Sequence, residues 1–488
     1  MRERVLQTAY PGLLAALVAT GLLSACAAGP DYKRPDLELP QGWATPQAAT
    51  AAAQSADTQS ERWWGLYADP VLDRLEQEAL AHNADLQVAL ARVMEVRAQL
   101  GNTEADQYPT VSGNLSGSRT KNTMIGSFPR PATLPRTMNF YHATLNASYE
   151  LDLWGRFRRA SEAARADLLA SEAARDGVRL SLTAQVAQQY FALLALDAQE
   201  AALKRALAGR EETLELDRKR VAVGVLSEYN LQQSVADAAA VRSQMASLTQ
   251  ARDRQETALA LLLGRSPRAV MDAEVELGAP GQAAAFVPGG LPSDLLLRRP
   301  DLRQAEQNLI AQNARIGVAR AQYFPSIGLT TYVGGESVSF ARLFSGPAGI
   351  FQFAANVTQP IFNAGRVGYA VDAATASRDR ALAQYKQAVA NAFGDVRDAL
   401  AAQAAAQQVL EAETTRAEAL EQAHRQSRLR YEHGIANRLE LLDVERNYLQ
   451  AELNRLDAQR AQRSAVADLF KALGGGWRAD AGERTAQP

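Results

Sequence analysis

Few side chains in this sequence could perform catalysis or hold a metal ion. The 488 residues include one cysteine and four histidines, His82, His142, His424 and His433, which lie far apart in the chain. The run Gly474-Gly-Gly-Trp477 follows no strand pattern and precedes no Lys-Ser or Lys-Thr, so it does not match a phosphate-binding loop. No set of nucleophile, base and oxyanion donors can be assembled from the motifs. We therefore expect no enzyme, no metal site and no bound cofactor.

The single cysteine, Cys26, follows a segment typical of secretion. Arg2 and Arg4 precede the apolar run 13–23, which is too short to span a bilayer and suits the core of a signal peptide. Leu23-Ser-Ala-Cys26 then resembles a bacterial lipobox. That resemblance implies cleavage after residue 25, a diacylglycerol on the sulfur of Cys26 and an acyl chain on its nitrogen. It also implies sorting to the outer membrane, because residue 27 is alanine and not aspartate. The alternative is an ordinary secretory signal with a chance cysteine.

Charge and composition exclude a polyelectrolyte partner. The chain carries 52 basic and 54 acidic residues, a net charge of −2, so we expect no nucleic acid partner.

The apolar fraction is 47%, and much of it is alanine, which favours helices over bulky core filling. Between Gly365 and Arg430 there is no proline, and a helix of that length would extend roughly 100 Å at 1.5 Å per residue. Such helices must pack side by side along their length.

The chain is an internal duplication. Arg220-Val-Ala-Val-Gly224 recurs 210 residues later as Arg430-Tyr-Glu-His-Gly434. Further pairs in the same order are Asp85-Leu86 with Asp301-Leu302, Tyr108-Pro109 with Phe324-Pro325, Gly155-Arg156 with Gly365-Arg366, and Leu263-Gly264 with Leu473-Gly474. Two halves in identical order indicate a tandem repeat. The expected organisation is a signal peptide at 1–25, a tether and equatorial segment at 26–68, repeat 1 at 69–264, a linker at 265–293, repeat 2 at 294–474 and a tail at 475–488.

Each half is predicted to form a helix, two strands, a long helix, a turn and a helix. Alternating apolar and polar residues predict strands near 110–120, 139–152, 326–337 and 350–361. No mature segment has the roughly 20 apolar residues of a membrane helix, whereas amphipathic strands can cross lipid as a closed barrel. Four strands are too few to close, but three subunits would supply twelve. The alternative is that these strands form the edge of a soluble sandwich.

Several motifs together resemble the TolC-like outer-membrane factors, closest to the lipoprotein branch that includes OprM and NodT. They are the lipobox, Gly29-Pro-Asp-Tyr-Lys-Arg-Pro35, Trp63-Trp64 with Asp69-Pro70, Arg299-Pro-Asp-Leu302, Gln322-Tyr-Phe-Pro325 and Leu439-Glu-Leu-Leu-Asp443. The resemblance covers nearly all of the mature chain. It implies an α+β membrane protein: a homotrimer with a twelve-stranded β-barrel in the outer membrane of a Gram-negative bacterium, continued by a long α-helical barrel in the periplasm.

The resemblance also implies a function and its partners. The family provides the exit duct of tripartite pumps, with a periplasmic adaptor and an inner-membrane transporter of the resistance-nodulation-division (RND) type. We therefore expect a passive efflux channel. One alternative is a duct for type I protein secretion. Another is a periplasmic coiled-coil adaptor or scaffold lipoprotein, although two complete repeats with membrane-type strands argue against that class.

The resemblance places a periplasmic gate in the second tip. Its residues here are Arg430, Tyr431, Leu439, Asp443 and Arg446. At the 210-residue spacing Asp443 aligns with Gln233 and Arg446 with Ala236, so only the second copy carries this Asp and Arg. Arg446 follows Asp443 by three residues on the same helical face and could relieve repulsion between carboxylates that converge on the trimer axis. The alternative is a solvated surface pair.

The turns themselves are expected to meet the adaptor. By resemblance, the adaptor's helical hairpins dock on Val223, Gly224, Val225, Leu226, Ser227, Gly434, Ile435 and Ala436. The alternative is that each glycine only terminates a helix.

Overall fold

The computed structural model describes residues 28–38, 40, 62–123, 135–272, 275–278, 298–433 and 435–475. Cys26, Gly434, most of the predicted linker and nearly all of the tail lie outside these ranges. The chain forms two compact units. The first comprises Met1–Pro35, Val93–Ala170 and Ala305–Tyr385, and the second Asp36–Arg92, Ser171–Gln304 and Lys386–Pro488. Both halves of the sequence contribute to each unit.

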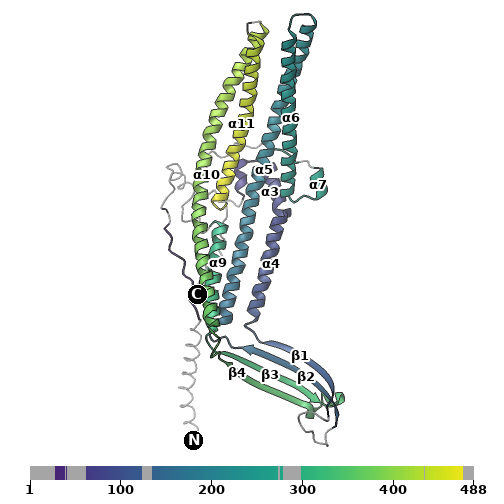
Figure 1. Ribbon diagram of the computed structural model, residues 1–488, viewed down its shortest axis with the longest axis vertical. Coiled ribbons are helices and arrows are strands. Elements are labelled where there is room, and N and C mark those ends of the chain that lie inside the picture. Colours follow the sequence, from purple (N-terminus) through teal and green to yellow (C-terminus); the bar gives the residue numbers. More distant parts are fainter. Residues whose placement is uncertain are drawn as a thin grey trace. The chain divides into compact units, whose positions relative to one another are not determined.

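The first unit contains one antiparallel sheet of four strands in the order β1-β2-β3-β4 (Figure 1). The strands are β1 (Thr110–Lys121), β2 (Thr137–Glu150), β3 (Ser326–Ser337) and β4 (Gly349–Thr358), each within a few residues of its predicted range. β2 from the first half pairs with β3 from the second, in a register that sets Leu145 opposite Val333. The short 3-10 helices η4 (Phe340–Arg342) and η5 (Gly346–Ala348) lie between β3 and β4.

The register places apolar and polar residues on opposite faces of the sheet. One row across the four strands is Gly113, Leu145, Val333 and Phe351, and the adjacent row is Ser112, Asn146, Tyr332 and Gln352. Much of the apolar face is exposed, since Phe351 is 84% exposed and Phe353 71%, whereas at the end near η4 the Phe340 ring packs against Tyr141. The alternating apolar and polar residues of each strand therefore lie on opposite faces of the sheet, as the sequence predicted.

The N-terminal segment 28–34 is held against the helices of the first unit. Arg34 donates two hydrogen bonds to Glu306, from Nε at 2.6 Å and Nη2 at 2.7 Å, and the Tyr32 hydroxyl donates a third at 3.1 Å. Gly317 leaves no room for a side chain here, because a Cβ would lie 2.5 Å from the Ala28 carbonyl oxygen. The sequence predicted that these residues belong to a tether, and it did not predict their contacts with Glu306 and Gly317.

Two helical hairpins of equal length arise from the duplication; their long helices begin in the first unit and continue into the second. In the first half α5 (Arg156–Ala222) is followed by α6 (Glu228–Leu262), and in the second α10 (Arg366–Glu432) is followed by α11 (Arg438–Ala472). The long helices have 67 residues each and the returning helices 35 each. None of the described helices is apolar over a stretch long enough to cross a membrane.

The helices that open the two halves differ from one another. Repeat 1 begins with two, α3 (Pro70–His82) and α4 (Ala84–Ala105), whereas one continuous helix was expected. Asn83 separates them: its side chain accepts a hydrogen bond from the Leu86 amide at 3.0 Å and donates to the Leu262 carbonyl at 2.9 Å. An asparagine inside an apolar stripe is thus a helix cap. Repeat 2 has α9 (Pro300–Ala321), and α7 (Pro267–Met271) lies in the predicted linker.

The core of the second unit forms around the tryptophan segment. The 3-10 helix η2 (Trp63–Tyr67) precedes α3, which Asp69 caps by accepting a hydrogen bond from the Val71 amide at 2.8 Å. Trp63 stacks on Phe470 at 5.3 Å between ring centroids, and Tyr67 packs on Phe191 at 4.6 Å. These contacts fix the bases of both hairpins, and the tips of the hairpins hold the predicted site.

Candidate functional site

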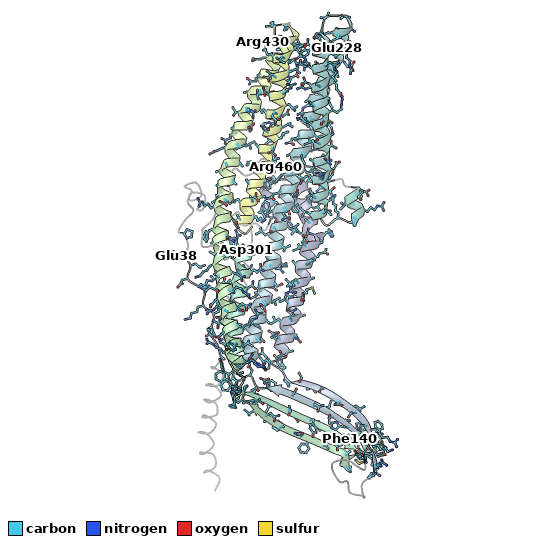
Figure 2. The ribbon with its side chains drawn as sticks, viewed as in Figure 1. Glu38, Phe140, Glu228, Asp301, Arg430 and Arg460 are labelled. Atoms are coloured by element: carbon cyan, nitrogen blue, oxygen red, sulfur yellow. The ribbon has the colours of Figure 1, made fainter. Side chains whose placement is uncertain are left out.

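The two tip turns share corresponding backbone hydrogen bonds at their flanking residues. In the first, Gly224 adopts φ 77°, and the Val225 amide donates to the Arg220 carbonyl at 2.9 Å. In the second, the Ile435 amide donates to the Arg430 carbonyl at 2.8 Å. A side chain caps the start of each returning helix. The Ser227 side chain accepts a hydrogen bond from the amide three residues later, and the Asn437 side chain does the same in the second hairpin. Figure 2 marks the first tip by Glu228 and the second by Arg430.

Most of the predicted docking residues are exposed. Val223 is 73% exposed, Val225 75% and Ile435 70%, while Gly224 and Ser227 are also exposed. Leu226 is half-buried and Ala436 is buried. Both tips thus present branched apolar side chains to solvent. Exposed apolar surface of this kind is typical of a surface that binds a partner.

The predicted gate residues do not form the pair that their spacing suggested. Arg446 binds Asp237 of α6, whereas Asp443 is exposed and accepts a hydrogen bond from Asn447 at 3.3 Å. Asp237 is 91% buried at the side chain, since 9% remains exposed, so its need for a cation exceeds that of the solvated Asp443. The i, i+3 spacing permitted an Asp443–Arg446 pair, and packing between the hairpins instead joined Arg446 to Asp237.

Other predicted gate residues lie between the tips. The Tyr431 hydroxyl accepts a hydrogen bond from Arg220 Nη1 at 3.1 Å, which links α10 to α5. Arg430 Nη2 lies 3.7 Å from Glu440 on its own hairpin, and Leu439 is 63% exposed. Tyr431 therefore joins the two hairpins of one protomer, and Leu439 is free to meet another surface.

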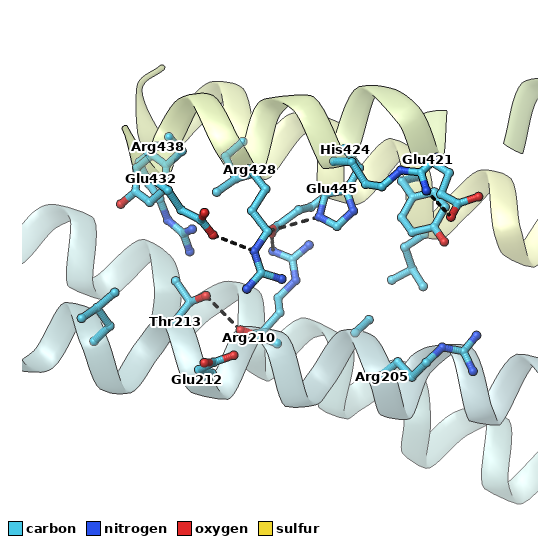
Figure 3. A pocket seen from close by; sticks show the side chains of 18 of the residues that line it. Arg205, Arg210, Glu212, Thr213, Glu421, His424, Arg428, Glu432, Arg438 and Glu445 are labelled. Carbon is cyan, nitrogen blue, oxygen red and sulfur yellow. Dashed lines mark hydrogen bonds and ion pairs between the residues drawn. The ribbon is translucent and has the colours of Figure 1, made fainter. Parts of the chain in front are cut away.

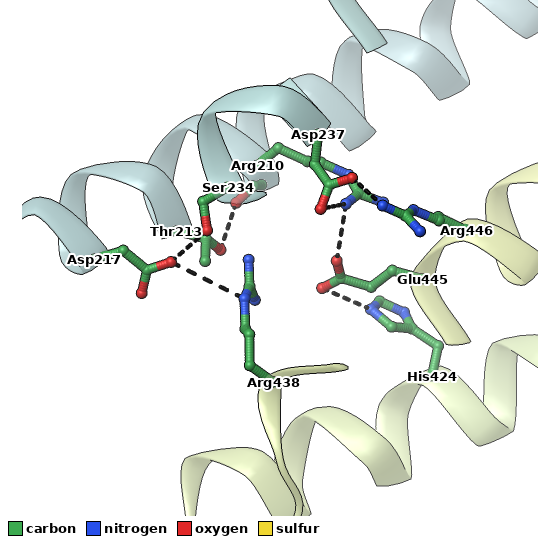
Figure 4. Close-up of polar contacts among 10 residues, drawn as sticks. Arg210, Thr213, Asp217, Ser234, Asp237, His424, Arg438, Glu445 and Arg446 are labelled. Carbon is green, nitrogen blue, oxygen red and sulfur yellow. Dashed lines mark hydrogen bonds and ion pairs between the residues drawn. The ribbon is translucent and has the colours of Figure 1, made fainter. Parts of the chain in front are cut away.

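A buried network of charges extends this link, and its members were missed at the sequence level (Figure 4). Arg210 Nη1 of α5 lies 3.7 Å from both Asp237 and Glu445. Arg438 Nε lies 4.0 Å from Asp217, which also accepts a hydrogen bond from the Ser234 hydroxyl at 2.6 Å. These groups come from three helices and are up to 235 residues apart in the chain. The only sequence signal near these residues was Arg220, which recurs as Arg430 in the second repeat.

His424 belongs to the same network. Its Nε2 lies 3.9 Å from Glu445, and its ring stacks on Tyr448 with 5.3 Å between centroids. Burial alone would raise the pKa of Glu445, but the neighbouring His424 and the charges of Arg210 and Arg438 hold that pKa below its usual range. Glu445 is thus kept ionised. Among the described residues no group of three or more His, Cys, Asp or Glu side chains could hold a metal ion.

Comparison with known proteins identifies the family. Residues 75–265 and 291–475, the two repeats, match the Outer membrane efflux protein family. The probable efflux pump outer membrane protein TtgC of Pseudomonas putida is 35% identical over 97% of this chain and 98% of its own length. The cation efflux system protein CusC of Escherichia coli K12 is 33% identical over 93% of this chain and 97% of its own.

Solved structures agree with these sequence matches. The CmeC outer membrane channel of Campylobacter jejuni superposes with a TM-score of 0.87 at 26% identity, over 93% of this chain and 96% of that one. The MtrE outer membrane channel of Neisseria gonorrhoeae, in its open state, gives 0.81 at 34% identity, over 92% and 98%. The expected fold class, four strands and long helices built from tandem repeats, is confirmed. The chain belongs to the outer membrane efflux protein family.

Proposed function

We propose that this protein is the outer-membrane exit duct of a tripartite RND-type efflux system and conducts small molecules passively. The observation that carries the proposal is the sheet: its apolar face is exposed, and both edge strands, β1 and β4, are unpaired within the described chain. Long open edges must pair with another chain or be covered. Three copies joined edge to edge supply twelve strands, with the apolar face toward lipid and the polar face toward a channel.

Relatives favour efflux over secretion. TtgC is described as a probable efflux pump outer membrane protein and CusC as a cation efflux protein. Cys26 lies outside the described residues, and we propose its lipidation on the lipobox alone. Neither the tips nor the network contains a catalytic arrangement, so the energy for transport comes from the inner-membrane partner.

The tips are proposed as the gate and the docking surface. The Arg446–Asp237, Arg438–Asp217 and Arg220–Tyr431 contacts hold the two hairpins of each protomer together. The closed arrangement is the one in which all three contacts are intact. Movement of one hairpin away from the other would break them together and open the tip. The exposed Asp443 of each of three protomers would form a ring of carboxylates that attracts cations. The apolar tip residues then receive the adaptor.

Planar lipid bilayers test the channel and its gate together. Purified wild-type protein is expected to give small, discrete conductance steps, and the double variant Asp443→Ala, Arg446→Ala larger ones, because the hairpins separate and the ring is lost. Arg460→Ala is the matched control, since within the described residues the ion pair of Arg460 is with Asp457 of the same helix. Absence of steps from correctly assembled wild-type protein contradicts the channel, and unchanged steps in the double variant contradict the gate.

Crosslinking in intact cells tests docking. A photoactivatable crosslinker attached through Ser227→Cys is expected to capture the periplasmic adaptor. The same reagent at Ser247→Cys, exposed further along α6, is expected to capture none. Equal capture at both positions, or none at Ser227, argues against docking at the tips.

A further inference from the structure

A cavity of about 590 Å³ lies between α5 and the α10–α11 hairpin (Figure 3). Its ionisable lining consists of six arginines, five glutamates and one histidine: Arg205, Arg210, Arg220, Arg425, Arg428, Arg438, Glu212, Glu421, Glu432, Glu445, Glu452 and His424. Tyr431, Tyr448 and Leu441 add apolar surface. The cavity is thus large enough for a small organic molecule and has both charged and apolar walls.

Most of the glutamates in this lining are already neutralised. Arg205 Nη2 lies 2.8 Å from Glu452, Arg428 Nε lies 3.0 Å from Glu432, and Arg425 Nη1 lies 3.7 Å from Glu421. Glu212 is exposed at the rim. Among the remaining lining residues Glu445 stands beside Arg210, Arg220 and Arg438, and the buried Asp237 and Asp217 lie behind the lining, 3.7 Å from Arg210 and 4.0 Å from Arg438.

Two of those arginines have unfilled donors. The side chains of Arg210 and Arg438 are only 7% and 11% exposed. Within the described chain Arg210 Nη1 and both Nε and Nη1 of Arg438 have no hydrogen-bond partner. A buried donor without an acceptor costs about 1–3 kcal/mol or more when charged, so such groups are normally satisfied.

The nearby aspartates do not satisfy these donors. Asp237 binds Arg446 through Oδ1, and Asp217 accepts its hydrogen bond from Ser234 through Oδ2, while the other oxygens, Asp237 Oδ2 and Asp217 Oδ1, are themselves buried without a hydrogen-bond partner within the described chain. The two aspartates stand 3.7 Å from Arg210 and 4.0 Å from Arg438, beyond hydrogen-bond distance, and neither lines the cavity. A third cation of the lining, Arg220, donates a hydrogen bond to the neutral Tyr431 hydroxyl. The interior therefore has room and donors for a further acceptor.

We propose that this cavity binds a small oxyanion, a molecule whose phosphate or carboxylate group bridges Arg210 and Arg438. Guanidinium groups present paired donors that match the oxygens of these anions. The tyrosines and Leu441 would contact an organic portion. The anion binds α5 on one side and the start of α11 on the other, so its binding draws the two hairpins of a protomer together. The site exists whether or not the protein conducts.

Isothermal titration calorimetry with pyrophosphate tests the site on the purified trimer in detergent at low ionic strength. Wild-type protein is expected to bind one pyrophosphate per protomer, and Arg438→Gln to weaken binding about tenfold or more by removing a charge-assisted contact. Arg460→Gln removes the same charge from the same helix outside the cavity. It is expected to bind as wild type does.

Arg220→Gln provides a second variant if Arg438→Gln does not assemble, because Arg220 lines the cavity and donates to the neutral Tyr431 hydroxyl. It too is expected to weaken binding. No saturable heat with wild type overturns the proposal. Equal affinity of Arg220→Gln or Arg438→Gln and Arg460→Gln also overturns it, since the binding would then be general attraction to surface charge.

Discussion

Glu445 is an acidic member of the tip network with basic neighbours on two other helices. It lies 3.7 Å from Arg210 and 3.9 Å from His424, on the helix that also carries Asp443 and Arg446. Its pKa is lowered by these neighbours despite its burial. A carboxyl whose folded pKa lies below its unfolded value stabilises the fold fully above the unfolded value, and this contribution disappears as the pH falls through the folded value.

The substitution Glu445→Gln is therefore expected to destabilise the protein in a pH-dependent way. At pH 7 the loss should be about 1 kcal/mol, the scale of a partly buried ion pair. The difference from wild type should shrink as the pH falls below 4.5, the usual value for this group. Thermal unfolding at pH 7 and pH 4 measures both. Glu211→Gln, in an exposed pair with Arg242, should have little effect at either pH. A difference that grows at low pH contradicts this account.

The sequence could identify some of these residues and not others. Asp443 and Arg446 were visible because the second repeat carries them and the first does not. Asp237 and Arg210 do not stand out in the comparison of the two repeats. Their role depends on contacts with α11, whose residues lie more than 200 positions later in the chain. Which carboxylate takes Arg446 depends on the packing between hairpins, and spacing along one helix does not contain that information.

At the scale of elements, the predicted strands and long helices agree with the structure because strong periodicity fixed them. The break at Asn83 was missed because its cap lies inside an apolar stripe that continues on both sides. The N-terminal segment was missed for another reason: it has no periodicity, and its order comes from Glu306 and Arg159, which lie in distant helices. Local pattern predicts elements well and docking of extended segments poorly.

The N-terminal segment should be released when Glu306 is removed. Glu306 accepts three hydrogen bonds from Tyr32 and Arg34, and Arg159 Nη2 binds Asp31 at 2.5 Å. In Glu306→Ala the first set is lost, so trypsin should cleave after Lys33 faster than in wild type. Glu104→Ala removes an exposed partner of Arg165 in the same unit and serves as the control. Equal cleavage rates in all three proteins would show that Glu306 does not hold the segment.

At the scale of the whole molecule, the duplication solves a problem of closure. One repeat supplies two strands and one hairpin, and the chain supplies four strands and two hairpins of matched length. Three copies then bring twelve strands and six hairpins around one axis, and every strand edge finds a partner. The differences between repeats at the tips give such an assembly three tips with Asp443 and Arg446 that alternate with three that lack them.

Insertion of this assembly into the outer membrane depends on which face of the sheet meets lipid. Phe353 lies on the apolar face, and its neighbour Gln352 lies on the polar face. Phe353→Lys should therefore block insertion, since a lysine facing the bilayer midplane costs about 2–4 kcal/mol per copy, whereas Gln352→Lys should insert normally because its side chain faces a water-filled channel. Outer-membrane fractionation, with gel mobility of the unheated trimer in detergent, measures both. If the two variants insert equally well, the apolar face does not contact lipid, and this result contradicts the proposed β-barrel.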